Sequence, residues 1–184
     1  MRLEPLEPRH EEPLWQVARD ERTFRWFSSR ANESREAFRA WFELVRAGWL
    51  PFATVVDGRA LGSTSYGNVR EQDRVVEIGN TWLAPEAWGS GANVEAKLLM
   101  LEHAFEDEGF LRVEFKTDAK NERSRAALAA LPAEFEGVFR KHMLVRGGER
   151  RDSAWYSVID DDWPAVKAAL RERLAGKAAA AGER

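Results

Sequence analysis

The sequence predicts an α/β domain, in which helices cover both faces of a mixed β-sheet. Apolar residues follow a helical period in some segments and an alternating period in others. One helical segment separates two strand-like segments, which is the pattern of a βαβ crossover. The chain has 184 residues, of which 44% are hydrophobic, and it contains neither an internal repeat nor a linker. This suits one domain with a full core.

The first part of the chain is predicted to form a short strand and two helices. The strand is "RLEPL" (residues 2–6), and residues 10–27 have helical spacing. The stronger helix spans residues 34–48 and ends at Gly48. Its buried face is expected to carry four residues at i, i+3, i+4 and i+7, which are Phe38, Trp41, Phe42 and Val45.

The middle of the chain is predicted to form three strands, a helix and a fourth strand. Residues 51–69 read as a hairpin around Asp57-Gly58, and residues 74–85 as the next strand. A helix over 93–108 leads to a strand over 110–118, so these last two strands should be parallel and adjacent. The buried stripe of this helix is expected at Val94, Leu98, Leu101 and Phe105.

The last part is predicted to form a short helix, a hairpin and a closing helix. Asn121 is a good N-cap for the short helix, and residues 135–145 and 152–160 read as paired strands. The closing helix begins near Asp161 and carries Pro164 in its first turn. We expect one domain over residues 1–174 and a flexible C-terminal tail over residues 175–184.

Composition excludes several classes of function. The net charge of −3 and the pI of about 5.8 do not favour a nucleic-acid-binding surface. The chain has no cysteine, and His10, His103 and His142 lack zinc-site spacing, so no metal is expected. No run of residues reaches transmembrane length, so no membrane partner is expected and the cytoplasm is the expected location.

The stretch "WGSGAN" stands directly before the helix predicted over 93–108. The N-terminus of a helix has unpaired N–H groups and a partial positive charge, and these bind anions. Glycines let the backbone curl around such an anion. An ordinary strand-to-helix loop is the alternative. A P-loop and a dinucleotide fingerprint fit worse, because the lysine of the first and the third glycine of the second are missing.

Several motifs resemble one family in their order along the chain. "WGSGANVEA" resembles the W-G-x-G-x-x-x-E-A segment of RimJ/RimL-type members of the GCN5-related N-acetyltransferase (GNAT) superfamily. "VEFKTDAKNERSRAAL" resembles its fifth strand and following helix, with the N-x-x-S pattern at Asn121 and Ser124. The resemblance implies a six- to seven-stranded, mostly antiparallel sheet whose fourth and fifth strands splay apart.

The resemblance also implies acetyl-coenzyme A (acetyl-CoA) as the donor and co-substrate. Its pantetheine arm would lie along the fourth strand near Trp82 and Leu83, with a hydrogen bond from Asn121. Lys120, Arg123 or Arg125 would meet the ribose phosphate, unless these side chains simply face solvent. The pyrophosphate would lie on the N–H groups of six consecutive residues, which are Trp88, Gly89, Ser90, Gly91, Ala92 and Asn93.

Acetyl transfer to an amine needs a neutral amine, a stabilised oxyanion and a proton for the leaving thiolate. Glu77 is the first candidate base, because a carboxylate between Val76 and Ile78 is unusual unless that face opens on a cleft. His142 is the second candidate base, because histidine titrates near neutral pH. By the resemblance, Ser124 would protonate the thiolate. Each of the three is also compatible with a plain surface or ion-paired role.

The acceptor amine is left open between three interpretations. The first is a protein N-terminal α-amine, as the RimJ/RimL-type resemblance suggests. The second is a small amine, such as a polyamine, an amino acid or an aminoglycoside. The third is an idle module that binds acyl-CoA or another protein. Phe24, Trp26 and Phe27 would form either an aromatic wall at the acceptor side or part of the core. A homodimer is suggested by analogy.

Overall fold

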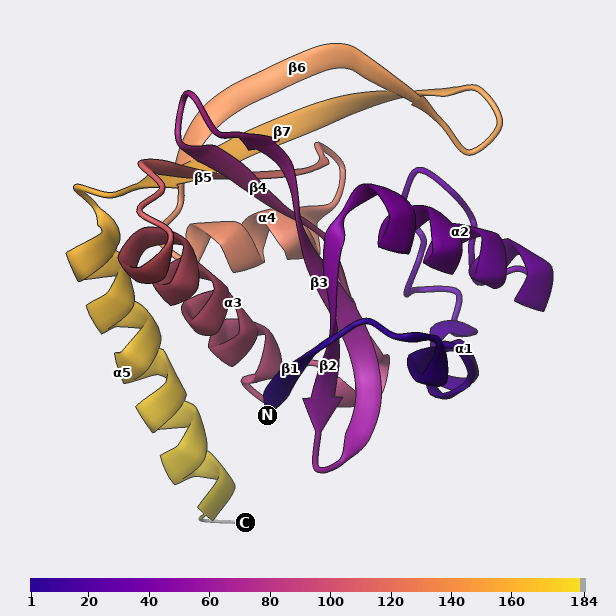
Figure 1. Ribbon diagram of the computed structural model, residues 1–184, viewed down its shortest axis with the longest axis horizontal. Coiled ribbons are helices and arrows are strands. Elements are labelled where there is room, and N and C mark those ends of the chain that lie inside the picture. Colours follow the sequence, from indigo (N-terminus) through magenta and orange to yellow (C-terminus); the bar gives the residue numbers. More distant parts are fainter. Residues whose placement is uncertain (183–184) are drawn as a thin grey trace.

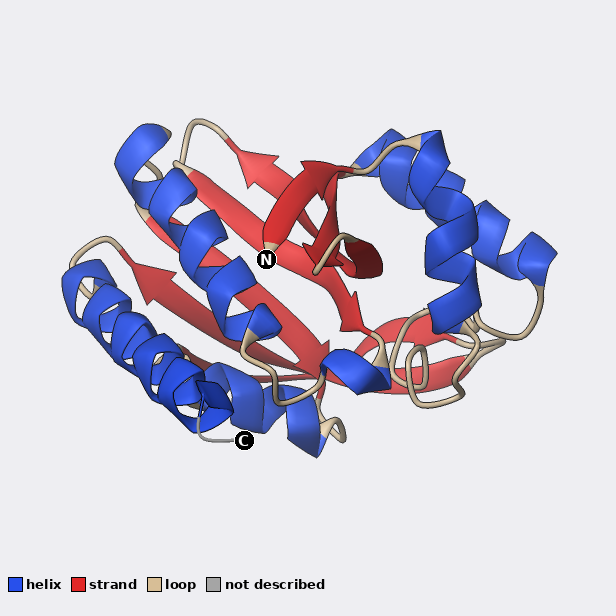
Figure 2. Ribbon diagram, turned by 90° about the horizontal axis from the view of Figure 1, so that it is seen from below, coloured by secondary structure: helices blue, strands red, loops and turns tan. Residues whose placement is uncertain are grey.

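The structure is a computed structural model that describes residues 1–182, and it contains one seven-stranded sheet with helices on both faces (Figures 1 and 2). The strand order is β1-β2-β3-β4-β5-β7-β6. Only the β4–β5 pair is parallel among these neighbours. The mixed, mostly antiparallel sheet predicted from the sequence is therefore confirmed. The strands are β1 (Arg2–Pro5), β2 (Leu50–Val56), β3 (Arg59–Arg70), β4 (Val75–Leu83), β5 (Arg112–Asp118), β6 (Glu134–Val145) and β7 (Glu149–Ile159).

Five α-helices lie in the described part of the chain, with short helical turns beside them. The α-helices are α1 (Glu11–Ala18), α2 (Arg35–Gly48), α3 (Ala92–Glu102), α4 (Glu122–Ala129) and α5 (Trp163–Gly182). The short turns are η1 (Pro8–His10), η2 (Pro85–Ala87) and the π-helical η3 (His103–Asp107). Ser34 caps α2 by accepting a hydrogen bond from the Ala37 N–H, and Asn121 caps α4 in the same way.

The sheet carries a separate apolar core on each face. One core joins α3, α4 and α5 to the sheet and includes the fully buried Leu101 and Leu170. The other core joins α1 and α2 to the sheet and includes Phe38 and Phe42. Because side chains alternate along a strand, β2 contributes Phe52 to the first core and Ala53 to the second.

Two element boundaries differ from the predicted ones. The helix predicted over residues 10–27 ends at Ala18, and turns follow, because Phe24 folds back into the core. The closing helix continues through Gly182, since its alanine-rich end has high helix propensity. Residues 175–182 are thus helical, the flexibility of the expected tail stays a prediction, and residues 183–184 lie outside the described residues.

Across residues 1–182, no helix is long and apolar enough to cross a membrane. The described residues also contain no cluster of His, Asp or Glu that could hold a metal ion.

Strands β4 and β5 separate after a short paired region, as the resemblance implied. Their pairing covers Val75↔Arg112, Val76↔Val113 and Glu77↔Glu114 and then stops. Beyond Glu77, β4 pairs only with β3, and β5 pairs only with β7. A register shift in β4 surrounds Asn80, whose φ of 49° is a left-handed value that asparagine tolerates. From residue 78 to residue 83, one edge of β4 is therefore unpaired.

Candidate functional site

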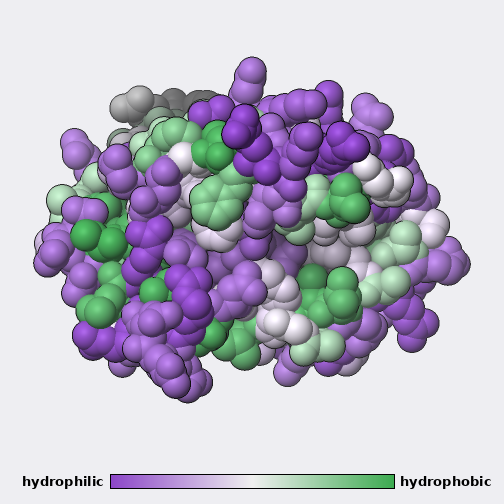
Figure 3. Space-filling view, turned by 90° about the horizontal axis from the view of Figure 1, so that it is seen from above, coloured by the Kyte–Doolittle hydropathy of each residue, from purple (hydrophilic) through white to green (hydrophobic). Residues whose placement is uncertain are grey.

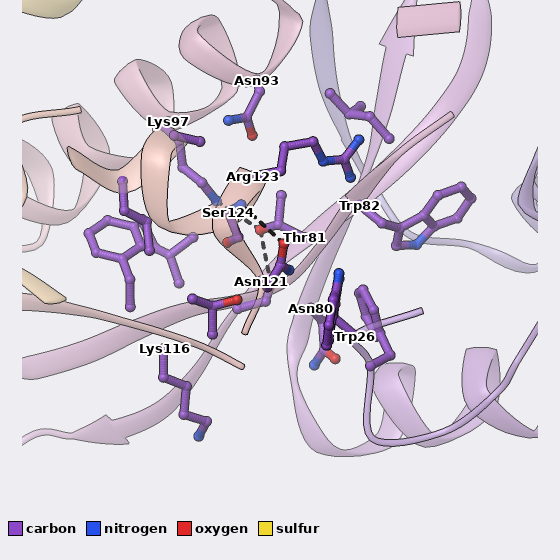
Figure 4. A pocket seen from close by; sticks show the side chains of 18 of the residues that line it. Trp26, Asn80, Thr81, Trp82, Asn93, Lys97, Lys116, Asn121, Arg123 and Ser124 are labelled. Atoms are coloured by element: carbon purple, nitrogen blue, oxygen red, sulfur yellow. Dashed lines mark hydrogen bonds between the residues drawn. The ribbon is translucent and has the colours of Figure 1, made fainter. Parts of the chain in front are cut away.

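A cavity of about 610 Å³ opens where β4 and β5 separate. Its walls come from β4, β5, α3 and α4, from the middle of α5, and from aromatic residues of α2 and the segment before it. The side chains at its centre come from three elements and approach one another at Thr81, Lys97, Asn121 and Ser124 (Figure 4).

The glycine turn forms one end of this cavity. Gly89 and Gly91 have φ values of 79° and 102°, which side chains with a Cβ rarely adopt. Gly91 is the N-cap of α3, so the turn leads directly into the first N–H groups of the helix. The curled backbone expected from "WGSGAN" is therefore present.

Some N–H groups of the turn already have partners inside it. The N–H groups of Trp88 and Ser90 donate to the carbonyls of Pro85 and Ala87, at 3.1 and 3.4 Å. The N–H of Ala92 donates to Ser90 Oγ at 3.2 Å. The anion site expected on the six N–H groups from Trp88 to Asn93 therefore has fewer free donors, because three of the six already donate to η2 carbonyls or to the Ser90 side chain. The N–H groups of Gly89, Gly91 and Asn93 are the donors left for an anion.

Cationic side chains surround the turn. Lys177 of α5 donates from Nζ to the Gly89 carbonyl at 2.8 Å, and its stem would contact a Cβ at Gly91. The guanidinium of Arg123 lies 3.4 Å from the ring centroid of Trp88, and Arg22 lies 5.2 Å from the same ring. Burial lowers the pKa of Arg123 below its ordinary value, and the charge of Arg22 lowers it further. An anion at the turn would relieve this repulsion.

The free edge of β4 forms the middle of the cavity. A Cβ at Gly62 of β3 would meet the Trp82 carbonyl at 2.1 Å, so this carbonyl faces β3. Main-chain groups of neighbouring strand residues point to opposite edges, and those of Thr81 and Leu83 therefore face the gap. The Leu83 carbonyl accepts a hydrogen bond from Trp88 Nε1 at 2.8 Å. Thr81 thus takes the place in the cavity that the sequence had given to Trp82.

The Trp82 side chain points away from the cavity centre (Figure 4). It packs in the core under α1 and α2, where its ring centroid lies 5.3 Å from that of Phe24. Its backbone belongs to β4, but its indole is a core residue.

Helix α4 brings Asn121 and Ser124 to the cavity. Asn121 Oδ1 accepts the Ser124 N–H at 3.1 Å, which fixes the side chain as the helix cap and turns its amide nitrogen elsewhere. Of the three cations expected near the ribose phosphate, Arg123 lines the cavity, whereas Arg125 binds the hydroxyl of Tyr156.

Lys97 of α3 is a buried amine at the centre of the cavity. The residue is 5% exposed, and Nζ donates to Thr81 Oγ1 at 2.8 Å and to Thr64 Oγ1 at 3.3 Å. Nζ also lies 5.8 Å from the ring centroid of Phe115. Burial lowers the pKa of Lys97 from 10.5 to about 7. No carboxylate among the described residues forms an ion pair with it.

Glu77 lines the cavity at the point where β4 and β5 separate. It is 2% exposed, and Oε2 accepts from Lys116 Nζ at 2.9 Å and from Asn68 Nδ2 at 2.6 Å. Its carboxylate is therefore both a cavity group and one half of a buried ion pair. From the sequence, a cleft-facing carboxylate and an ion-paired carboxylate were alternatives for Glu77. In the structure Glu77 is both.

His142 lies on β6, outside the cavity wall. Its Nδ1 is 3.0 Å from Ser153 Oγ, and its ring contacts Trp155 and Phe139. Partial burial lowers the pKa of His142, and the charges of Lys116 and Arg151 lower it further. The imidazole is therefore neutral at neutral pH and able to accept a proton.

The end of the cavity beside α2 is aromatic. Trp26, Phe27, Trp41 and Trp49 line it, while Phe24 is 1% exposed and belongs to the core. The sequence left open whether residues 24–27 form an aromatic wall or part of the core. Trp26 and Phe27 line the cavity, and Phe24 belongs to the core.

The structure thus gathers the turn, Leu83, Asn121, Ser124 and Glu77 around one cavity and places His142 beside it. Three further cavity residues, Thr81, Lys97 and Lys177, were not predicted from the sequence. A signal for Lys97 was present, because it stands three residues after Val94 and four before Leu101, on the predicted buried stripe. No comparable signal marks Lys177, which lies in the segment expected as a tail.

The chain matches a family model described as "Acetyltransferase (GNAT) domain" over residues 1–133. No curated protein matches the sequence.

Solved structures share the fold over nearly the whole chain. A putative acetyltransferase from T. thermophilus is 40% identical, with a TM-score of 0.87 and coverage of 94% of this chain and 93% of that one. A GCN5-related N-acetyltransferase from Brucella melitensis is 31% identical, with a TM-score of 0.87 and coverage of 94% and 81%. RimJ from Mycobacterium smegmatis, solved in complex with CoA-disulfide, is 23% identical, with a TM-score of 0.79 and coverage of 95% and 88%.

The buried amine of Lys97 predicts a measurable dependence of stability on pH. Its folded-state pKa of about 7 lies below that of an unfolded lysine, so the unfolded chain binds one more proton between these two values. The destabilisation is complete below the folded pKa and disappears as the pH rises toward the unfolded one. From about pH 7.5 to about pH 9, the free energy of unfolding should therefore rise by ~2 kcal/mol more in the wild type than in Lys97→Met.

Chemical denaturation at both pH values measures this difference. Lys167→Met is the matched control, because Lys167 of α5 is ion-paired with Glu102 and Glu106, which raises its pKa. Lys167 therefore stays protonated between these two pH values, and the variant should keep the wild-type slope. Equal slopes for the wild type and Lys97→Met would contradict the lowered pKa.

Proposed function

Because the chain belongs to the GNAT family and is therefore an acetyl-CoA-dependent N-acetyltransferase, we propose that its acceptor is the N-terminal α-amine of a protein. The family accounts for acetyl transfer to an amine. The choice of acceptor is our proposal, and it makes the protein RimJ/RimL-like in activity as well as in sequence motifs.

The charge of the cavity is the observation that carries this choice. Among its described lining residues, the single carboxylate is Glu77, and Lys116 neutralises it. The cationic residues of the lining are Arg22, Lys97, Lys116, Arg123, Arg151, Arg173 and Lys177. A polyamine or an aminoglycoside carries several positive charges, and the described lining offers no unpaired carboxylate to bind them. A peptide N-terminus carries one charge, and the aromatic wall of Trp26, Trp41 and Trp49 suits an apolar first side chain.

The glycine turn and the free edge of β4 would hold the donor. The N–H groups of Gly89, Gly91 and Asn93 and the cations of Arg123 and Lys177 form a site for its phosphates. The unpaired edge of β4 offers main-chain partners to the amides of the pantetheine arm, as an added strand would. The Asn121 side chain borders the same space.

The reaction follows from the groups around Thr81. The neutral amine attacks the thioester carbonyl carbon, and the Thr81 N–H on the free edge stabilises the oxyanion. Glu77 is the first candidate to take the proton of the amine, and His142, with its lowered pKa, is the second. The C–S bond then breaks, and CoA leaves as the thiolate. The family resemblance suggests Ser124 as the proton donor to that thiolate.

An α-amine needs only modest help from a base. Its pKa is about 7.8, so about one molecule in seven is neutral at pH 7. A lysine side chain, with a pKa of about 10.4, would need a far stronger base. A carboxylate held by Lys116, acting through water, fits the first requirement better than the second.

Assembly and location stay predictions. Hydrophobic side chains lie among hydrophilic ones on the face that is uppermost in Figure 1 (Figure 3). On β6, Phe139 and Leu144 are 53% and 75% exposed, and exposed apolar side chains of this kind support the homodimer expected by analogy. We also keep the cytoplasm as the proposed location.

A thiol-release assay with an acceptor panel tests the proposal. Peptides with a free N-terminus should be acetylated, whereas the same peptides with a blocked N-terminus, which keep their lysines, should not be. Preferred turnover on spermidine or an aminoglycoside would contradict the proposal, and preferred turnover on free amino acids would move it to the small-amine class. Binding of acetyl-CoA without turnover on any amine would indicate an idle module.

The glycine turn is tested with Gly91→Ala. Its Cβ would lie 3.2 Å from Lys177 Cδ at a φ of 102°, so the turn must distort. We expect the dissociation constant for CoA to rise by about 5- to 150-fold, because a distortion of about 1–3 kcal/mol acts on the site itself. Gly176→Ala makes the same chemical change in α5 where nothing lies within 4 Å, and it should bind CoA normally. Calorimetry measures the dissociation constant for CoA in both variants. Unchanged binding by Gly91→Ala would show that the glycine turn is not part of the donor site.

The base is tested with Glu77→Gln and His142→Ala. If Glu77 takes the proton, Glu77→Gln should lower kcat by about a hundredfold or more, while CoA binding persists. Glu114→Gln is the matched control, because Glu114 is the register partner of Glu77 on β5 and lies outside the cavity wall. Full turnover by both test variants across the pH range would mean that binding and orientation alone carry the rate.

A further inference from the structure

The centre of the cavity contains a buried amine that the reaction above does not use. Lys97 projects from α3 toward β4, and its amine ends beside Thr81 (Figure 4). A buried ammonium without a carboxylate partner is costly, so its retention calls for an explanation. The two hydroxyls that hold it are also hydrogen-bonded to each other, since Thr64 Oγ1 lies 2.8 Å from Thr81 Oγ1. They would therefore remain satisfied without the lysine.

Thr81 connects the amine to the gap between β4 and β5. Its hydroxyl accepts from Lys97 Nζ, while its main-chain groups face the free edge. If the carbonyl oxygen of the thioester accepts a hydrogen bond from the Thr81 N–H, the carbonyl carbon lies next to Thr81, and the sulfur is bonded directly to that carbon. The Thr81 hydroxyl holds the amine of Lys97 on the same residue, so the amine is the cation beside the thioester.

We propose that Lys97 is the group that stabilises and protonates the leaving thiolate of CoA. This inference rests on the proposed function. In the step, the acceptor nitrogen bonds to the acyl carbon, and the C–S bond breaks with its electron pair on sulfur. The sulfur then takes a proton from Lys97 Nζ, and the neutral amine regains a proton from solvent when the products leave. The proton that the acceptor nitrogen loses goes to the base.

The surroundings of Lys97 suit this role. It faces Thr64 of β3, Thr81 of β4 and the ring of Phe115 of β5, all of them uncharged. The single carboxylate of the described cavity wall, Glu77, is held by Lys116 and Asn68. With a pKa of about 7, the amine is protonated in about half of the molecules at neutral pH and gives up its proton readily. A serine hydroxyl such as that of Ser124 is a much weaker acid, which leaves Ser124 the role of a hydrogen-bond donor to the sulfur.

The test uses free CoA and needs no acceptor. The thiol of bound CoA is titrated through the ultraviolet absorbance of its thiolate, with the wild type, Lys97→Met and the control Lys167→Met. The two groups titrate as a pair, because a thiolate beside Lys97 raises the pKa of the amine in turn and keeps it protonated. The pKa of the bound thiol should therefore be lower by about one unit or more in the wild type and in the control than in Lys97→Met. Calorimetry on each variant verifies that CoA is bound.

The outcomes separate this inference from the proposed function. Failure of the wild type to bind CoA would overturn both. Normal CoA binding with the same thiol pKa in the wild type and Lys97→Met would overturn this inference alone. Mass spectrometry after incubation with acetyl-CoA adds a second readout, because an acetyl group on Lys97 would identify it as a nucleophile and contradict its role as an acid. If Lys97→Met does not fold, Lys97→Gln keeps a polar group at the hydroxyls, removes the charge and should raise the thiol pKa in the same way.

Discussion

The structure depends on the point at which two parallel strands stop pairing. β4 and β5 share three residue pairs, after which each strand keeps only its antiparallel partner. An unpaired strand edge at the centre of a sheet exposes main-chain donors and acceptors that must find partners. A linear ligand with amide groups can supply them. The cavity, the free edge of β4 and the position of Thr81 all follow from this divergence.

The elements around the point where β4 and β5 separate place different chemical groups at the two ends and at the centre of the cavity. The glycine turn and α5 bring N–H groups and cations to one end. Aromatic residues of α2 and of the segment before it form the other end. Between them, α3 delivers a single buried amine. A donor with phosphates at one end and a reactive thioester at the other therefore has one orientation that satisfies both ends.

The sequence predicted the parts of this arrangement that depend on local patterns. The crossover from β4 through α3 to β5, the hairpins and the left-handed glycines follow from periodicity and turn chemistry. It could not predict which N–H groups of the turn remain available, because the hydroxyl of Ser90 and the turn η2 compete for them. The early end of α1 depends on the burial of Phe24, which is a tertiary effect.

Two cavity residues, Lys97 and Lys177, were not predicted from the sequence, because their residue type is usually found in a solvent-exposed position. Lys97 lies on the buried stripe of α3, yet a lysine in a helix usually faces water. Lys177 lies in an alanine-rich end that has the composition of a tail, and only the packing of α5 against the turn brings it to Gly89. Trp82 shows the opposite case, since its backbone belongs to the edge strand of the cavity while its side chain belongs to the core.

Hydrogen exchange of the main-chain amides tests most directly whether the free edge of β4 receives the pantetheine arm. The account predicts that CoA slows exchange in residues 78–83 and in the glycine turn, whereas the nucleotide half of CoA, which lacks the arm, slows exchange in the turn alone. If CoA and its nucleotide half protect the same amides and leave residues 78–83 unchanged, the arm does not bind along β4 and the account is wrong.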